Sequence, residues 1–151
     1  MKTKFILIKL FLFSVLVSSN SVFAQTLTSC TVIFVTPDCD GCDNKDHDTR
    51  IRVSVFGAYG SEVASTYYTD NKEFPDNGSE NAVPCTITSN QNGAGAFAQK
   101  IWVSIEPNGN DDWVFEARVI FNLSHGSTIV SNMRGRAQVS RGNPTVELWN
   151  Q

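Results

Sequence analysis

Apolar and polar residues alternate along several short stretches of this chain, which is the pattern of strands that bury one face. The clearest run begins at Trp113, after which every second residue up to Phe121 is apolar. The segments 51–56 and 101–105 alternate in the same way. Further strands are predicted at the following positions: 31–35, 62–68, 128–130 and 145–149.

Turn-forming residues separate these predicted strands. The alternating pattern is interrupted at three places: Gly-Ala-Tyr-Gly at 57–60, a polar loop around Pro75 and Asn77, and Pro-Asn-Gly-Asn-Asp-Asp at 107–112. No stretch has the spacing of a long amphipathic helix. The sequence therefore predicts an all-β fold, and a two-sheet antiparallel β-sandwich fits this strand pattern best.

The N-terminal segment is expected to lie outside this fold. Basic residues precede an apolar run from Phe5 to Val17, and Val-Phe-Ala at 22–24 ends in a small residue. These features predict a secretory signal peptide over 1–24 and a secreted, extracellular product. No second apolar stretch is long enough to cross a membrane. Residues 25–151 are therefore expected to form one domain.

Charge excludes one class of partner. Loss of the predicted signal removes three lysines and leaves nine basic against fifteen acidic side chains, a net charge of −6. An acidic domain with no Lys/Arg cluster is unsuited to nucleic acid. It is also unsuited to simple attraction to anionic lipid. We expect a monomer.

Four cysteines remain after the signal peptide, and a secreted protein favours disulfides. Three pairings are formally open. We favour Cys30–Cys85 and Cys39–Cys42 as the two disulfides, although the Cys-x-x-Cys at 39–42 with His47 nearby also has the ligand types of a zinc site. Asn77 and Asn122 begin Asn-x-Ser sequons and are candidate glycosylation sites.

Two segments of the sequence, taken together, resemble a known family. Residues 46–57 read Asp-His-Asp-Thr-Arg-Ile-Arg-Val-Ser-Val-Phe-Gly, and residues 109–119 read Gly-Asn-Asp-Asp-Trp-Val-Phe-Glu-Ala-Arg-Val. The first segment is an acidic turn that leads into a strand ending in Phe-Gly, and the second is an Asp-Trp turn that leads into a core strand. This combination resembles the PLAT (LH2) β-sandwich. The small secreted plant embryo-specific and stress PLAT-like proteins are the most similar in their cysteine positions and in the Ala-Tyr-Gly at 58–60.

This resemblance implies a function and a metal. PLAT domains mediate lipid or protein contact, so it implies a non-catalytic module that binds a lipid or membrane surface, in a stress or developmental response. The alternative is an extracellular protein-interaction module without lipid or calcium. In a PLAT-like sandwich the two acidic turns lie at one end, and their oxygen atoms suit calcium. The implied calcium ligands are Asp46, Asp48, Asn110, Asp111 and Asp112, with Arg50 adjacent to them.

Aromatic side chains supply the candidate contact residues. Trp102 lies on the face of its strand opposite Ile101, Val103 and Ile105, which makes it a candidate contact residue. The favoured alternative is that it is buried against a loop or the second sheet. Tyr59 and Tyr67 form a second candidate contact patch. We expect no catalytic site, because neither histidine lies in a recognisable nucleophile or triad motif.

Overall fold

The computed structural model describes residues 25–39, 44–75, 77–89, 95, 97–107 and 112–151. The predicted signal peptide at 1–24 lies outside the described residues. The described part contains no helix, and therefore none that is long and apolar enough to cross a membrane. Its strands, all antiparallel, are β1 (Leu27–Val35), β2 (Arg50–Phe56), β3 (Glu62–Tyr68), β4 (Glu80–Ile87), β5 (Lys100–Glu106), β6 (Asp112–Leu123), β7 (Thr128–Asn132), β8 (Ala137–Ser140) and β9 (Thr145–Trp149).

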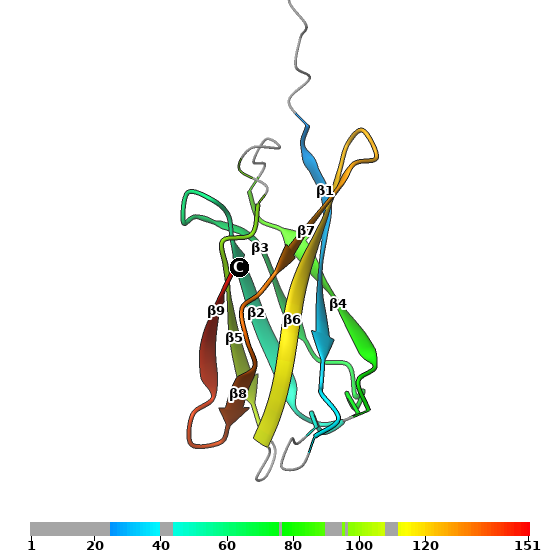
Figure 1. Ribbon diagram of the computed structural model, residues 1–151, viewed down its shortest axis with the longest axis vertical. Helices are drawn as coiled ribbons and strands as arrows, with labels where there is room; N and C mark the ends of the chain where they lie inside the picture. The colour runs from blue at the N-terminus through cyan, green and yellow to red at the C-terminus, as the bar shows by residue number, and fades with distance from the viewer. Residues whose placement is uncertain (1–24, 40–43, 76, 90–94, 96, 108–111) are drawn as a thin grey trace, which may run out of the picture.

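The strands form one continuous, curled sheet (Figure 1). Its order is β7-β6-β1-β4-β3-β2-β5-β9, and β8 pairs with the first part of β6, on the side where β7 pairs with the last part. The link between β4 and β3 is short. Only Ala64↔Ile87 and Ser65↔Thr86 are paired there, so the rest of β4 has β1 as its partner.

The two ends of the sheet meet at the C-terminus. Met133 and Asn150 form an antiparallel bridge. The amide of Arg134 donates to the carbonyl of Trp149 at 2.7 Å, and the amide of Gln151 donates to the carbonyl of Asn132 at 3.1 Å. Backbone hydrogen bonds thus join the end of β7 to the end of β9 and leave few unpaired edge groups there.

The core fills the interior of this curled sheet. Every second residue of β6 from Trp113 to Phe121 is buried, as the alternation predicted. At the end of the sheet where β6 begins, four aromatic rings lie together. Phe34 is 5.0 Å from Trp113 and 5.2 Å from Phe115, and Phe74 is 5.7 Å from Trp113, between ring centroids. These distances are typical of favourable aromatic pairs.

Phe74 comes from a connection rather than a strand. It forms an isolated bridge with Lys45 and is completely buried. Its carbonyl accepts from the hydroxyl of Thr36, which in turn accepts from the indole N–H of Trp113 at 3.0 Å. This segment lies where β3 and β4 are unpaired, and it therefore closes the sheet at that corner.

Lys45 is also completely buried, which is rare for a lysine. Its ammonium donates to the carbonyl oxygens of Asp46 and Lys72, each at 2.8 Å. It lies 5.1 Å from the centroid of the Phe74 ring, within reach of a cation–π interaction. These partners compensate the cost of removing the ammonium from water.

The prediction of an all-β, antiparallel fold is confirmed, with three differences. The strands form a single curled sheet instead of two separate ones. The sequence pattern missed β4, because Pro84 suggested a turn; β4 tolerates Pro84 since it lacks a second partner strand at that position. The pattern also missed β8, whose four residues are too few to establish a period.

The cysteines are only partly placed as predicted. Cys30 and Cys85 are free thiols in the structure, so the disulfide predicted between them is not formed there. They are nevertheless directly opposite each other on β1 and β4. Hydrogen bonding to the Cys85 thiol, together with burial, raises the pKa of Cys30 above its ordinary range. Cys39 is disulfide-bonded, and Cys42, its predicted partner, lies outside the described residues.

Replacement of Lys45 should measure how much its buried hydrogen bonds contribute to the free energy of unfolding. In Lys45→Met the apolar stem remains, but the carbonyl oxygens of Asp46 and Lys72 lose a buried donor. We expect the free energy of unfolding to fall by about 1–3 kcal/mol, as measured by urea denaturation. Arg141→Met is the control. Arg141 is exposed, so its loss should change stability by less than about 0.5 kcal/mol. Equal stability of Lys45→Met and the wild type would contradict this role.

Candidate functional site

The acidic end of the sheet is the end at which β2 and β6 begin, and it contains Asp46, Asp48 and Asp112 (Figure 1). Asp46 is exposed, and its carbonyl accepts from the amide of Thr49 at 3.3 Å to close a turn. Asp48 is half-buried beside Arg50 and Glu106 in a shallow pocket of about 240 Å³. The fold thus brings Asp46, Asp48 and Asp112 to one end.

A complete calcium site cannot be traced through the described residues. Asn110 and Asp111, two of the implied ligands, lie outside them. Within the described part of the chain, no three His, Cys, Asp or Glu side chains form a group suited to a metal ion. The calcium site stays a prediction, and Lys45 already places one positive charge next to Asp46.

Arg50, Arg52, Tyr67 and Glu106 form a hydrogen-bonded cluster on the outer face of the sheet. The Tyr67 hydroxyl donates to the Glu106 carboxylate at 2.6 Å, and Arg52 pairs with the same carboxylate at 2.9 Å. The Arg52 guanidinium also lies 4.4 Å from the centroid of the Tyr67 ring. Hydrogen bonds from Tyr67 and Arg52 lower the pKa of Glu106, and the Tyr67 hydroxyl raises the pKa of Arg50.

Two of the predicted contact residues, Tyr67 and Trp102, lie in one groove of about 670 Å³ on this outer face. Tyr67 is on β3 and Trp102 is on β5, with β2 between them. The groove is lined by residues of β2, β3, β4 and β5 and the segment that follows β4: Arg52, Val53, Ser54, Ser65, Thr66, Tyr67, Thr86, Thr88 and Trp102.

The third predicted contact residue, Tyr59, lies elsewhere. It is in the turn between β2 and β3, at the end of the sheet opposite the acidic end, and is 75 % exposed. Two exposed aromatic side chains that the sequence pattern did not single out, Phe97 and Trp149, lie at the same end. We call Tyr59, Phe97 and Trp149 the aromatic tip. The pattern of apolar and polar residues does not reveal the aromatic tip, because its three residues come from separate segments of the chain.

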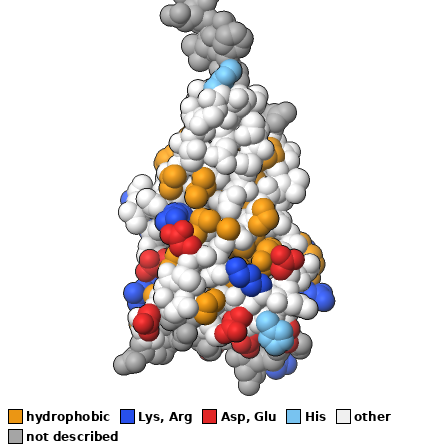
Figure 2. Space-filling model, turned by 90° about the vertical axis from the view of Figure 1, so that its right-hand side faces the viewer, with side chains coloured by type: hydrophobic (Ala, Val, Ile, Leu, Met, Phe, Trp, Pro, Cys, Tyr) orange, Lys and Arg blue, Asp and Glu red, His pale blue; other side chains and the backbone are white. Residues whose placement is uncertain are grey.

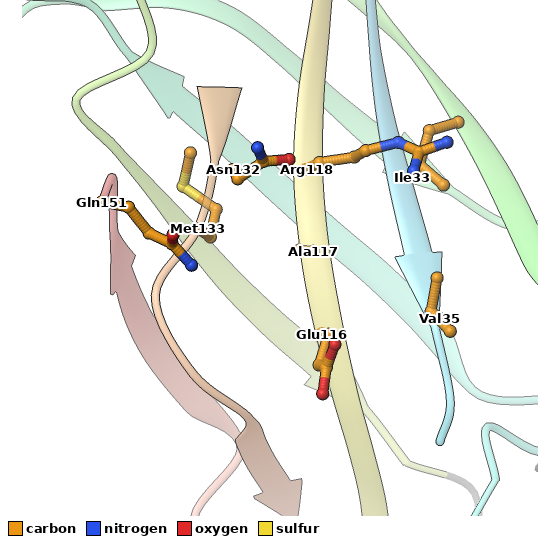
Figure 3. A pocket seen from close by; sticks show the side chains of 8 residues that line it. All are labelled: Ile33, Val35, Glu116, Ala117, Arg118, Asn132, Met133 and Gln151. Carbon is orange, nitrogen blue, oxygen red and sulfur yellow. The ribbon is translucent and has the colours of Figure 1, made fainter. Parts of the chain in front are cut away.

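A second, smaller pocket of about 240 Å³ lies over β1 and β6 (Figure 3). It is lined by Ile33, Val35, Glu116, Ala117, Arg118, Asn132, Met133 and Gln151. The Arg118 side chain extends from β6 across to Ile33 on β1 (Figure 3) and pairs with Glu80 on β4 at 2.6 Å. Its stem covers Ile33, which is 7 % exposed. This region therefore serves packing between three strands.

Both sequon asparagines lie on the surface. Asn77 is exposed, and its side-chain oxygen accepts from the Ser79 amide at 3.0 Å. Asn122 is exposed on β6, but its amide nitrogen donates to the Ser29 hydroxyl at 2.8 Å. A glycan on Asn122 would disturb that hydrogen bond, so Asn77 is the more accessible acceptor.

Comparison with known proteins does not assign this site. No protein-family model matches the chain. Functionally characterised proteins likewise give no match. The function must therefore be argued from the two surface features described above, the groove and the aromatic tip.

The cluster around Glu106 gives a testable pH dependence. Because the folded-state pKa of Glu106 is lowered, its contribution to stability is present above the unfolded-state pKa. This contribution is lost as the pH falls through the folded-state value. Tyr67→Phe removes the largest cause of the shift, so the pKa of Glu106 should rise toward its ordinary value. Carboxyl NMR titration measures it. Tyr59→Phe should leave the pKa unchanged, and no rise in Tyr67→Phe would contradict the assignment.

Proposed function

We propose that this chain is a secreted, non-catalytic binding module of the PLAT-like type that contacts a membrane surface through its aromatic tip. The exposure of Tyr59, Phe97 and Trp149 at one end of the sheet supports this most directly. Their exposed fractions are 75 %, 43 % and 49 %. Aromatic side chains with a polar edge are favoured at the boundary between headgroups and acyl chains.

The three tip residues come from segments that meet at the ends of adjacent strands. In the register of the sheet, Phe56 at the end of β2 faces Lys100 on β5, and Lys100 faces Trp149 on β9. The turn that carries Tyr59 follows Phe56 directly. The amide of Gln99, two residues after Phe97, donates to the carbonyl of Phe56 at 2.9 Å.

One lysine lies between two aromatic rings beside the tip. The ammonium of Lys100 is 4.8 Å from the Phe56 ring centroid and 5.2 Å from that of Trp149, and it pairs with Glu147 at 2.8 Å. A lysine held in this way aligns the Trp149 ring without creating a large positive patch. Such a tip suits insertion among zwitterionic headgroups better than attraction to anionic ones.

The charges elsewhere agree with this mode of contact. On the face in Figure 2, acidic and basic side chains lie mixed together and hydrophobic ones are scattered. The acidic end, where calcium is predicted, is at the opposite end of the sheet from Tyr59. Contact through the tip therefore does not use calcium as a bridge, although calcium at the acidic end would add stability to the fold.

Vesicle binding tests the tip. Trp149 is the exposed tryptophan, whereas Trp113 is completely buried. In a Trp102→Phe background, phosphatidylcholine vesicles should shift tryptophan emission to shorter wavelength and carry the protein into the pellet on sedimentation. Tyr59→Ser combined with Phe97→Ser should reduce the bound fraction at least fivefold, with or without calcium.

The matched control for this experiment is Tyr67→Ser, because Tyr67 is an exposed tyrosine on the same sheet but away from the tip. It should bind vesicles like the wild type. The proposed membrane contact would be overturned if the wild type did not sediment with the vesicles. It would also be overturned if the tip variant sedimented to the same extent as the wild type. If the tip instead bound an extracellular protein, vesicles would change neither the emission nor the sedimentation of the wild type. The tip variant would then lose binding to that protein.

We further propose that the secreted protein closes the Cys30–Cys85 disulfide. The register places the two thiols opposite each other on adjacent strands, and a bond between them would join β1 to β4. In the chain-entropy model such a long loop contributes on the order of 4 kcal/mol.

Oxidation of the reduced protein tests this bond. Mild oxidation should remove two titratable thiols and raise the denaturation midpoint, and peptide mapping should identify Cys30 linked to Cys85. Cys85→Ser should block both effects. Two free thiols after prolonged oxidation of the native protein would contradict the bond.

A further inference from the structure

The groove that contains Tyr67 and Trp102 lies on the outer face of the sheet and differs from the aromatic tip in chemical character. Its floor is a row of small hydroxyl side chains on three neighbouring strands. Ser54 on β2 faces Ser65 on β3, and Ser65 faces Thr86 on β4. With strands about 5 Å apart, this row extends roughly 10 Å across the sheet.

Two large side chains bound this row of hydroxyls. Trp102 is the partner of Ser54 on β5, so its indole ring stands at one end of the row. Tyr67 and Arg52 form the next row of the sheet and stand along one side. Tyr67 is 40 % exposed and is held in place by its hydrogen bond to Glu106. The Tyr67 wall is thus fixed before a ligand arrives, which reduces the entropy cost of binding.

Ion pairs border the groove on two sides. Arg52 forms an ion pair with Glu106, at 2.9 Å. Beyond Trp102, Glu147 is paired with Lys100. An anionic ligand would have to break one of these pairs, whereas a neutral ligand would leave both intact. Each hydroxyl offers one hydrogen-bond donor and two acceptor lone pairs. The groove is therefore complementary to a neutral molecule that carries many hydroxyl groups.

We propose that this groove is a carbohydrate-binding site that takes a short neutral oligosaccharide. The C–H face of a sugar ring packs on the Trp102 indole. Tyr67, with the Arg52 guanidinium stacked on its ring, bounds the side of the site. The sugar hydroxyls exchange hydrogen bonds with Ser54, Ser65 and Thr86. A groove of about 670 Å³ has the size of ordinary small-ligand sites.

The same features disfavour other occupants. An acyl chain would leave the hydroxyl floor without hydrogen-bond partners, which is costly once water is excluded. An extended peptide binds by adding to the open edge of a sheet. Ser54 and Ser65 lie on interior strands, and each of these strands is already paired with a strand on both sides. The sugar site uses residues other than the three of the tip, so each proposal can be tested with its own variants.

An array of neutral and anionic oligosaccharides, followed by calorimetry with the strongest neutral oligosaccharide, tests the site. The wild type should bind a subset of neutral oligosaccharides. Trp102→Ala and Tyr67→Ala should each weaken binding at least tenfold, which corresponds to about 1.4 kcal/mol. Ser65→Ala should weaken binding several-fold, because it removes one hydroxyl and leaves both rings in place.

Two comparisons keep the result interpretable. Tyr59→Ala removes an exposed tyrosine of the tip and should bind the oligosaccharide like the wild type. Trp102→Phe retains a ring for packing and should recover part of the affinity, provided thermal melting shows each variant folded. Binding by no neutral oligosaccharide, binding of anionic ones alone, or equal affinity in Trp102→Ala would overturn the proposal. None of these results bears on vesicle binding by the tip.

Discussion

The packing of Phe74 against Trp113 and Phe34 is the contact on which the curled sheet depends. β3 and β4 are paired only at Ala64 and Ser65, and beyond that point they separate. An open corner of this kind would expose the core to water. Phe74 fills it from a connecting segment, at 5.7 Å from Trp113 and 6.3 Å from Phe34. The cost of ordering that segment is offset by burying a whole aromatic side chain.

The buried ammonium of Lys45 belongs to the same arrangement. It supplies the hydrogen-bond donors that the turn carbonyls of Asp46 and Lys72 need once Phe74 has excluded water from them. The acidic end is therefore organised around an internal cation. Lys45 thus places a positive charge beside the backbone of the turn in which Asp46 and Asp48 lie.

The closed sheet also explains why the two proposed binding features are separate. Joining Met133 to Asn150 leaves the inner face for the core alone, so ligands can reach only the outer face and the ends. The outer face of β2, β3 and β5 carries the hydroxyl groove between Tyr67 and Trp102. The end at which β2 finishes carries the aromatic tip. The groove is lined largely by hydroxyl side chains, whereas the tip consists of exposed aromatic side chains. This difference in chemistry argues for two different kinds of ligand.

The amino-acid sequence by itself determined the strand content and the direction of most side chains, because a period of two residues is a local property. It predicted the buried positions of β6. It also predicted that the acidic turns before β2 and β6 share one end, by resemblance. Tertiary structure alone decided which distant residues meet: Phe74 with Trp113, Lys45 with the carbonyl of Lys72, and Phe97 with the end of β9. Those contacts join segments that lie far apart in the chain, and no local pattern of apolar and polar residues records them.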